Sequence, residues 1–242
     1  MVTIAYELAA QDPAGVRIAA EVGAARVELA QALALGGLTP SPASIVRAVE
    51  AAGDDVEVHV LVRARAGSFH YSDEELSLME HDVRYAVSAG ADGVVIGCQA
   101  ASGTLDRDGI ARLRDAAGDA SVTLHRVIDV TPDPLAALRT ARALGLHRVL
   151  TSGGASAAAD GVETLRALVA EANGEIEVMA GSGINASNVA MIADAGVDAV
   201  HFSAKRTVAD AGNVRMGSAS DGVGGYEVTD LELARATVAA LR

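Results

Sequence analysis

Short runs of alternating apolar and polar residues recur along the chain, and longer stretches with helical periodicity separate them. The run 121–129 alternates: Val122, Leu124 and Ile128 share one side of an extended strand, whereas Thr123, His125 and Asp129 share the other. Helical stretches begin at signals such as Asp12-Pro13 and Ser72 followed by Glu75. Regular repeats of strand and helix predict a parallel sheet.

The pattern predicts eight strands, at about 3–8, 26–30, 56–62, 93–97, 121–127, 148–151, 176–180 and 198–202. Helices are predicted at about 13–22, 42–51, 73–89, 107–116, 134–144, 160–172, 186–195 and 230–241. Eight such units in 242 residues predict an α/β fold, a (β/α)8 TIM barrel in which residues 1–242 form a single domain. An open doubly wound sheet is the alternative, and 203–229 is the longest irregular segment.

The direction of each strand's side chains follows from the strand at 56–62, where one side is entirely valine and should pack on helices. The opposite sides of the strands then face the barrel interior, and near their C-terminal ends they would line a site. Arg126 falls on the outer side unless the strand end turns it inwards. The inward set comprises Glu7, Glu28, His59, Arg63, His125, Asp129, His201 and Ser203.

Buried charges must pair, bind a ligand or contact water, because an unpaired buried ion costs several kcal/mol. One interpretation is a closed lattice in which Glu7 and Glu28 pair with Arg26 and Arg63. The other is a site that binds a ligand at the C-terminal mouth of the barrel.

As an enzyme site, this mouth would suit a small phosphorylated or carboxylated metabolite and lyase or isomerase chemistry. Glu28 or His125 would move a proton, Asp129 would orient a neighbour, and Arg63 with Arg65 would clamp an anion. Loops after the last strands often bind phosphate in this fold. The candidates there are Gly181, Ser182, Gly183 and Ser203, with a contribution from Ser152; tight turns without a ligand are the alternative.

As a metal site, the same interior offers imidazole and carboxylate ligands. His59, His125 and His201, with Glu7 and Glu28, could hold Cu(II) or Zn(II).

Charge and composition narrow the classes of partner. A net charge of −13 argues against nucleic acid and anionic membranes. The chain has no apolar run of the roughly 18 residues that a spanning helix needs, and its start lacks the basic segment of a signal peptide. The single cysteine, Cys98, predicts no internal disulfide and fits a cytoplasmic location. Lys205, the single lysine, reflects either codon bias or an amine poised to form a Schiff base.

Several motifs together resemble the CutC family of copper homeostasis proteins. They are Arg26-Val27-Glu28-Leu29, Gly36-Gly37-Leu38-Thr39-Pro40-Ser41, Arg63-Ala64-Arg65, Val122-Thr123-Leu124-His125-Arg126 with Asp129, Arg148-Val149-Leu150-Thr151-Ser152-Gly153 and His201-Phe202-Ser203-Ala204. The resemblance implies a (β/α)8 barrel and a cytoplasmic homo-oligomer linked to copper handling.

The chain departs from the family where copper would bind. The family often carries cysteines at the ends of the first two strands, and this chain has Ala9 and Ala30 there. The resemblance implies copper as a cofactor. Copper(I) prefers thiolate or thioether ligands, and this chain lacks the cysteines that are proposed to bind it in the family. The polar interior remains, and it predicts a small anionic ligand or a metal ion as the partner.

Overall fold

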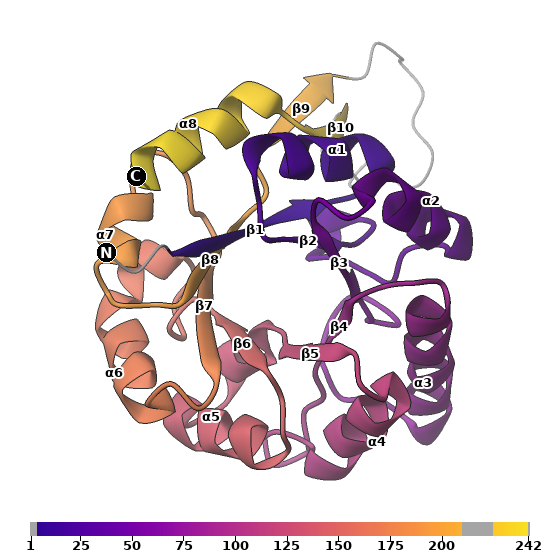
Figure 1. Ribbon diagram of the computed structural model, residues 1–242. Helices are drawn as coiled ribbons and strands as arrows, with labels where there is room; N and C mark the ends of the chain where they lie inside the picture. The colour runs from indigo at the N-terminus through magenta and orange to yellow at the C-terminus, as the bar shows by residue number, and fades with distance from the viewer. Residues whose placement is uncertain (1–3, 210–224, 242) are drawn as a thin grey trace.

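The computed structural model describes residues 4–209 and 225–241. Eight parallel strands close into a barrel in chain order, and helices surround it (Figure 1). The predicted (β/α)8 barrel is therefore confirmed. The barrel strands are β1 (Ala5–Ala10), β2 (Arg26–Leu29), β3 (Glu57–Leu61), β4 (Gly93–Ile96), β5 (Ser121–Leu124), β6 (Arg148–Thr151), β7 (Glu177–Gly181) and β8 (Ala199–Phe202).

The helices of the outer ring begin largely where capping residues predict. Asp12 accepts a hydrogen bond from the Gly15 amide at 2.8 Å, with Pro13 in the first turn, and Ser72 forms a capping box with Glu75. The α-helices are α1 (Pro13–Val22), α2 (Pro42–Ala52), α3 (Asp73–Ser88), α4 (Arg107–Ala117), α5 (Pro134–Ala143), α6 (Val162–Ala172), α7 (Val189–Ala193) and α8 (Leu231–Leu241). Short 3-10 helices are η1 (Leu33–Leu35), η2 (Arg126–Val130) and η3 (Ala158–Asp160).

Hydrophobic packing separates the outside of the barrel from its inside. The large core lies between strands and helices, and it contains Val58, Val60 and Val62, as the parity of β3 predicts. Two small apolar clusters come from the opposite side of the strands: Leu61 with Val95, and Leu150 with Met179. The interior is thus only partly apolar, which leaves room for polar groups among these clusters.

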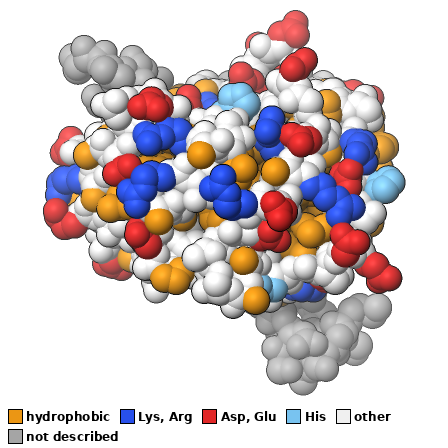
Figure 2. All heavy atoms as spheres, turned by 90° about the horizontal axis from the view of Figure 1, so that it is seen from below, with side chains coloured by type: hydrophobic (Ala, Val, Ile, Leu, Met, Phe, Trp, Pro, Cys, Tyr) orange, Lys and Arg blue, Asp and Glu red, His pale blue; other side chains and the backbone are white. Residues whose placement is uncertain are grey.

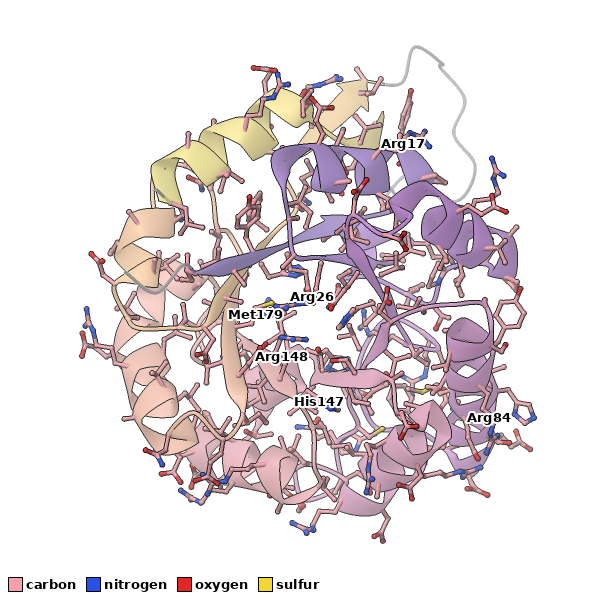
Figure 3. All side chains as sticks on the ribbon, viewed as in Figure 1. Arg17, Arg26, Arg84, His147, Arg148 and Met179 are labelled. Atoms are coloured by element: carbon pink, nitrogen blue, oxygen red, sulfur yellow. The ribbon has the colours of Figure 1, made fainter. Side chains whose placement is uncertain are left out.

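Charged side chains also point into the barrel. Figure 3 shows Arg26, Arg148 and Met179 inside the ring of strands, whereas Arg17 and Arg84 lie outside it. Outside the barrel, basic and acidic side chains are interspersed over the helices that lie at the bottom of Figure 1, as Figure 2 shows. Among the described residues, no helix is both long and apolar enough to cross a membrane.

Three predicted boundaries were wrong. The strand expected at 121–127 ends at Leu124, and η2 follows directly, so strand parity does not apply to Arg126 or Asp129. The helix expected at 186–195 is reduced to the five residues of α7. Within the segment expected to be irregular, β9 (Lys205–Ala209) pairs antiparallel with β10 (Gly225–Thr229), and residues 210–224 lie outside the described part of the chain.

The large core should dominate stability. Leu113 of α4 is fully buried, so Leu113→Ala should lower the free energy of unfolding by about 2–5 kcal/mol, through lost burial and the cavity left behind. Leu78 of α3 is 54% exposed and serves as the control: Leu78→Ala should change it by less than about 0.5 kcal/mol. Urea denaturation measures both values, and equal losses would contradict this packing scheme.

Candidate functional site

A cavity of about 400 Å³ opens at the C-terminal mouth of the barrel. Apolar side chains such as Leu33, Leu61 and Phe202 form much of its wall. Eight residues that the sequence nominated for a site also line it: Glu28, Arg63, His125, Arg126, Ser182, Gly183, His201 and Ser203.

Two carboxylates and an imidazole meet at the floor of this cavity. Glu7 on β1 lies opposite His201 on β8, and the His201 Nδ1 is 2.8 Å from the Glu7 carboxylate. Glu28 on β2 completes the group, with ligand atoms of all three residues within 4.8 Å of one another. Glu7 itself is fully buried and holds its place beneath the cavity, while Glu28 and His201 line it.

The environment pushes the pKa values of these three residues apart. Burial alone would raise the pKa of Glu7, but the hydrogen bond to His201 and the positive charges of His201, His59 and Arg26 lower it to about 2. Burial disfavours a charged His201 ring, yet the hydrogen bond to Glu7 and the charges of Glu28 and Glu7 raise its pKa. Burial raises the pKa of Glu28 to about 7, against the opposing charge of His201.

Below Glu7 the barrel's charges are paired within the protein. Arg26 Nε lies 3.2 Å from Glu7 Oε2, and its Nη2 lies 3.9 Å from Glu177. Arg148 pairs with Glu177 and donates to the Thr123 hydroxyl at 3.0 Å. The lattice interpretation is therefore correct for Glu7 and Arg26, at the N-terminal half of the interior.

His59 belongs to this lower, paired half. Its ring is fully buried, and Nε2 lies 3.3 Å from the Glu57 carboxylate without hydrogen-bond geometry. It does not line the cavity, so the predicted grouping of His59 with His125 and His201 was wrong. Glu28 and His59 are register partners on neighbouring strands, but of the two only Glu28 lines the cavity.

His125 lines the cavity and carries a single ring proton. Its Nδ1 accepts a hydrogen bond from the Val127 amide at 3.1 Å, which assigns the ring proton to Nε2. Burial, and then the charge of Arg63, lower the pKa of His125 to about 3, so the ring is neutral at physiological pH. The Nε2 atom is buried and has no hydrogen-bond partner among the described residues.

Arg63 is a buried cation held by backbone carbonyls. Nη1 donates to the carbonyl oxygens of Leu35 and Gly37 at 3.0 and 2.9 Å, and Nη2 donates to Gly67 at 3.0 Å. It forms no ion pair within residues 4–209 and 225–241, and its Nε has no partner there. The lattice interpretation therefore does not hold for Arg63, whose charge is offset by carbonyl oxygens and not by a carboxylate.

Asp129 does not reach the cavity; it organises the loop beside it. Its carboxylate accepts hydrogen bonds from the Thr151 hydroxyl at 2.5 Å, from the Ser152 amide and hydroxyl, and from the Gly154 amide at 3.0 Å. Arg126 Nε donates to the same carboxylate at 2.8 Å. Because η2 replaces the strand end, Arg126 turns to the cavity, and Asp129 and Ser152 position it.

The predicted phosphate loop is incomplete. Ser182 and Gly183 line the cavity, whereas Gly181 packs below it against Leu150 and His201. The helix N-terminus that would have completed the site is absent here, because α7 begins at Val189. The preceding turn also engages its own amides: Asn188 Oδ1 accepts from the Asn185 amide at 2.9 Å.

Arg65 lies away from the cavity, so its predicted role in an anion clamp was wrong. Its guanidinium pairs with Glu75 and stacks over the Tyr71 ring, with Cζ 5.2 Å from the ring centroid. Arg65 thus ties the loop after β3 to the start of α3.

Among the lining residues that were not predicted, Phe69 and Lys205 have side chains that bear on ligand binding. Phe69, in the loop after β3, has no strand parity to reveal it; its ring centroid lies 4.6 Å from that of His125 and 5.2 Å from Arg63 Cζ. Lys205 lines the rim and pairs with Glu227 at 2.7 Å. The sequence signal for Lys205 was that the single lysine of the chain lies three residues after the last barrel strand.

The raised pKa of Glu28 has a consequence for stability. Since its folded-state pKa of about 7 exceeds the ordinary value of 4.5, the folded protein retains this proton more tightly than the unfolded chain. The resulting stability is present below pH 4.5 and is lost as the pH rises through 7. Glu28→Gln should therefore gain stability relative to the wild type between pH 5 and pH 8, by at most about 3 kcal/mol.

Urea denaturation of both proteins at the two pH values measures this gain. Glu163→Gln, at a side chain that is 89% exposed, is the control and should show no such trend. A difference between Glu28→Gln and the wild type that does not depend on pH would contradict the assignment.

Comparisons with known proteins agree with this architecture. A CutC family protein of Xylella fastidiosa (strain Temecula1) is 42% identical over 98% of this chain and 88% of its own. One from Xanthomonas campestris pv. campestris (strain B100) is 40% identical over 98% of both chains.

A solved CutC structure from Streptococcus agalactiae, assigned provisionally to copper homeostasis, is 32% identical. It superposes with a TM-score of 0.78 over 82% of this chain and 98% of its own. An aldolase, QR15, is 17% identical, with a TM-score of 0.64 over 84% of this chain and 91% of its own, and shares the fold. The CutC family model matches residues 4–206, and the chain therefore belongs to the CutC family.

Proposed function

We propose that the mouth of the barrel binds a small carboxylated or phosphorylated metabolite and transfers a proton on it. The observation that carries the proposal is that three of the eight buried side-chain atoms without partners in the described chain belong to residues that line this cavity: Glu28 Oε2, Arg63 Nε and His125 Nε2. All three residues line one cavity. Buried polar groups are normally hydrogen-bonded, so their convergence favours a ligand that satisfies them.

Each group has a distinct role in this proposal. Arg63 binds the anionic group of the metabolite, because its charge has no protein carboxylate to offset it. Glu28, with a pKa of about 7, can accept the proton of a hydroxyl-bearing carbon next to a carbonyl and return it to the carbonyl carbon, while the hydroxyl proton passes to the former carbonyl oxygen. The neutral His125 Nε2–H donates to the oxygen on which negative charge develops. This sequence is an isomerase reaction, and loss of a leaving group after the first step makes it a lyase.

Hydrogen exchange tests proton transfer directly. In D2O, the wild type should replace a carbon-bound proton of one member of a panel of sugar phosphates and sugar acids, followed by proton NMR. Glu28→Gln should slow this exchange about 10²–10⁴-fold, because the amide cannot accept the proton.

His81→Ala is the matched control, since His81 lies on the exposed surface of α3, where its Nδ1 contacts the Ser77 carbonyl. Its exchange rate should equal that of the wild type. If no compound in the panel exchanges or raises the melting temperature, the enzymatic proposal fails.

A second candidate is a divalent metal ion, in line with the copper homeostasis assigned to the relative from Streptococcus agalactiae. The cluster of Glu7, Glu28 and His201 offers two carboxylates and one imidazole, a donor set that suits Cu(II) or Zn(II). It does not suit copper(I): Ala9 and Ala30 stand where thiols are expected, and Cys98 is buried in the core outside the barrel. Burial raises the pKa of Cys98 to about 12, so its thiolate is scarce.

Titration calorimetry separates the metal candidate from the first. Zn²⁺ or Cu²⁺ should bind the wild type, and His201→Gln should weaken binding at least about tenfold, because it removes a ligand atom. Cys98→Ala should bind as the wild type does. Wild-type binding no tighter than that of an unrelated control protein would remove this candidate.

The resemblance also implies a cytoplasmic homo-oligomer. We propose both for this chain, supported by the family membership. Sedimentation of the purified protein would reveal a species above 24.4 kDa if the assembly forms.

A further inference from the structure

The N–H groups of Arg63 that make no hydrogen bond within the protein limit the class of anion that the site can bind. A guanidinium carries five N–H donors, and three are engaged by the carbonyls of Leu35, Gly37 and Gly67. Two remain: the buried Nε–H, which has no partner among the described residues, and, by subtraction, one hydrogen on Nη2, with the Tyr71 hydroxyl nearby. A pair of N–H groups on one guanidinium matches the two oxygens of a carboxylate.

A phosphate group is less well served at this mouth. It needs several donors around three oxygens, and the loop after β7 lacks the helix N-terminus that supplies them in related sites. The amides of Asn185 and Ser187 are engaged by asparagine side chains of the same turn. Arg126 donates through Nε and Nη2 to Asp129, Ser152 and Ala155, which leaves only its two Nη1 hydrogens, and Lys205 pairs with Glu227.

His125 supplies a donor next to the Arg63 charge. Phe69 contacts both residues, with 4.6 Å between the Phe69 and His125 ring centroids and 5.2 Å from Arg63 Cζ to the Phe69 centroid. Because the His125 ring is anchored through Nδ1, its Nε2–H has a fixed direction. Since His125 and Arg63 share Phe69 as a neighbour and both line the cavity, a ligand whose carboxylate binds Arg63 places its adjacent atoms near His125. The ligand atom that pairs with Nε2–H must accept a hydrogen bond.

We propose that the ligand is a carboxylate with an oxygen on the adjacent carbon, that is, a 2-hydroxy or 2-oxo acid. The carboxylate binds Arg63, and the adjacent oxygen accepts from His125 Nε2–H. Leu61, Leu150 and Phe202 surround the remainder of the ligand, so a short apolar chain fits. This inference rests on the proposed anion site and selects one of its two ligand classes.

A two-by-two comparison of ligands and variants tests the assignment. The ligands are 2-hydroxybutyrate and butyrate, which differ in one hydroxyl, and the variants are the wild type and His125→Ala. NMR titration of backbone amides should show that the wild type binds 2-hydroxybutyrate at least about tenfold tighter than butyrate. In His125→Ala this ratio should fall to about one while butyrate affinity stays within about twofold.

A control variant, an uncharged ligand and a variant of Arg63 distinguish the possible results. His81→Ala should keep the wild-type ratio, and 2-hydroxybutyramide, which lacks the charge, should bind neither protein. Arg63→Met should abolish binding of both acids; because Arg63 also holds the loops, its fold is checked by amide spectra, and His125→Ala carries the test if that variant unfolds.

Each contrary result has a distinct meaning. A wild-type ratio near one, or a ratio that His125→Ala leaves unchanged, would overturn the assignment. Tighter binding of glycerol 3-phosphate than of 2-hydroxybutyrate would overturn the carboxylate class but keep the proposed anion site. If neither of these two anions binds the wild type, the proposed anion site fails with it.

Discussion

The cost of burying charge governs the interior of this barrel. In the N-terminal half the protein pairs its own charges: Arg26 and Arg148 are compensated by Glu7 and Glu177. At the C-terminal mouth the pairing stops, and Arg63 is held by neutral carbonyls instead of a carboxylate. A buried ion without a partner is expensive, so a fold that keeps one is compensated elsewhere, here by a large apolar core outside the strands.

This asymmetry links the fold to its chemistry. The Glu7–His201 hydrogen bond fixes the floor of the cavity and concentrates negative charge there, which together with burial keeps Glu28 partly protonated near neutral pH. Across the cavity, the neutral His125 ring offers a hydrogen-bond donor, whereas the carboxylates at the floor offer acceptors. An acid–base carboxyl, a neutral donor and a free cation in one apolar pocket form an arrangement that suits a small polar anion better than a soft metal ion.

Sequence pattern predicted the direction of side chains but not their height along the barrel. Strand parity placed His59 and His201 inside, and both are inside; only the stagger of strands decides that His59 lies below the floor and His201 lines the cavity. Parity failed after Leu124, because a 3-10 turn follows and moves Arg126 inward and Asp129 behind it. Phe69 lay in a loop, where no periodicity reports direction.

The protonation states of His125 and His201 test whether charges are paired within the protein at the floor of the cavity and remain unpaired at its wall. Nitrogen NMR of the imidazole rings across pH 4–8 resolves charge and tautomer for each residue. His125 should stay neutral with its proton on Nε2 down to about pH 4, whereas His201 should keep its charge above the pH at which a free histidine loses it. If both rings titrate like an exposed histidine, near pH 6.5, the account is contradicted.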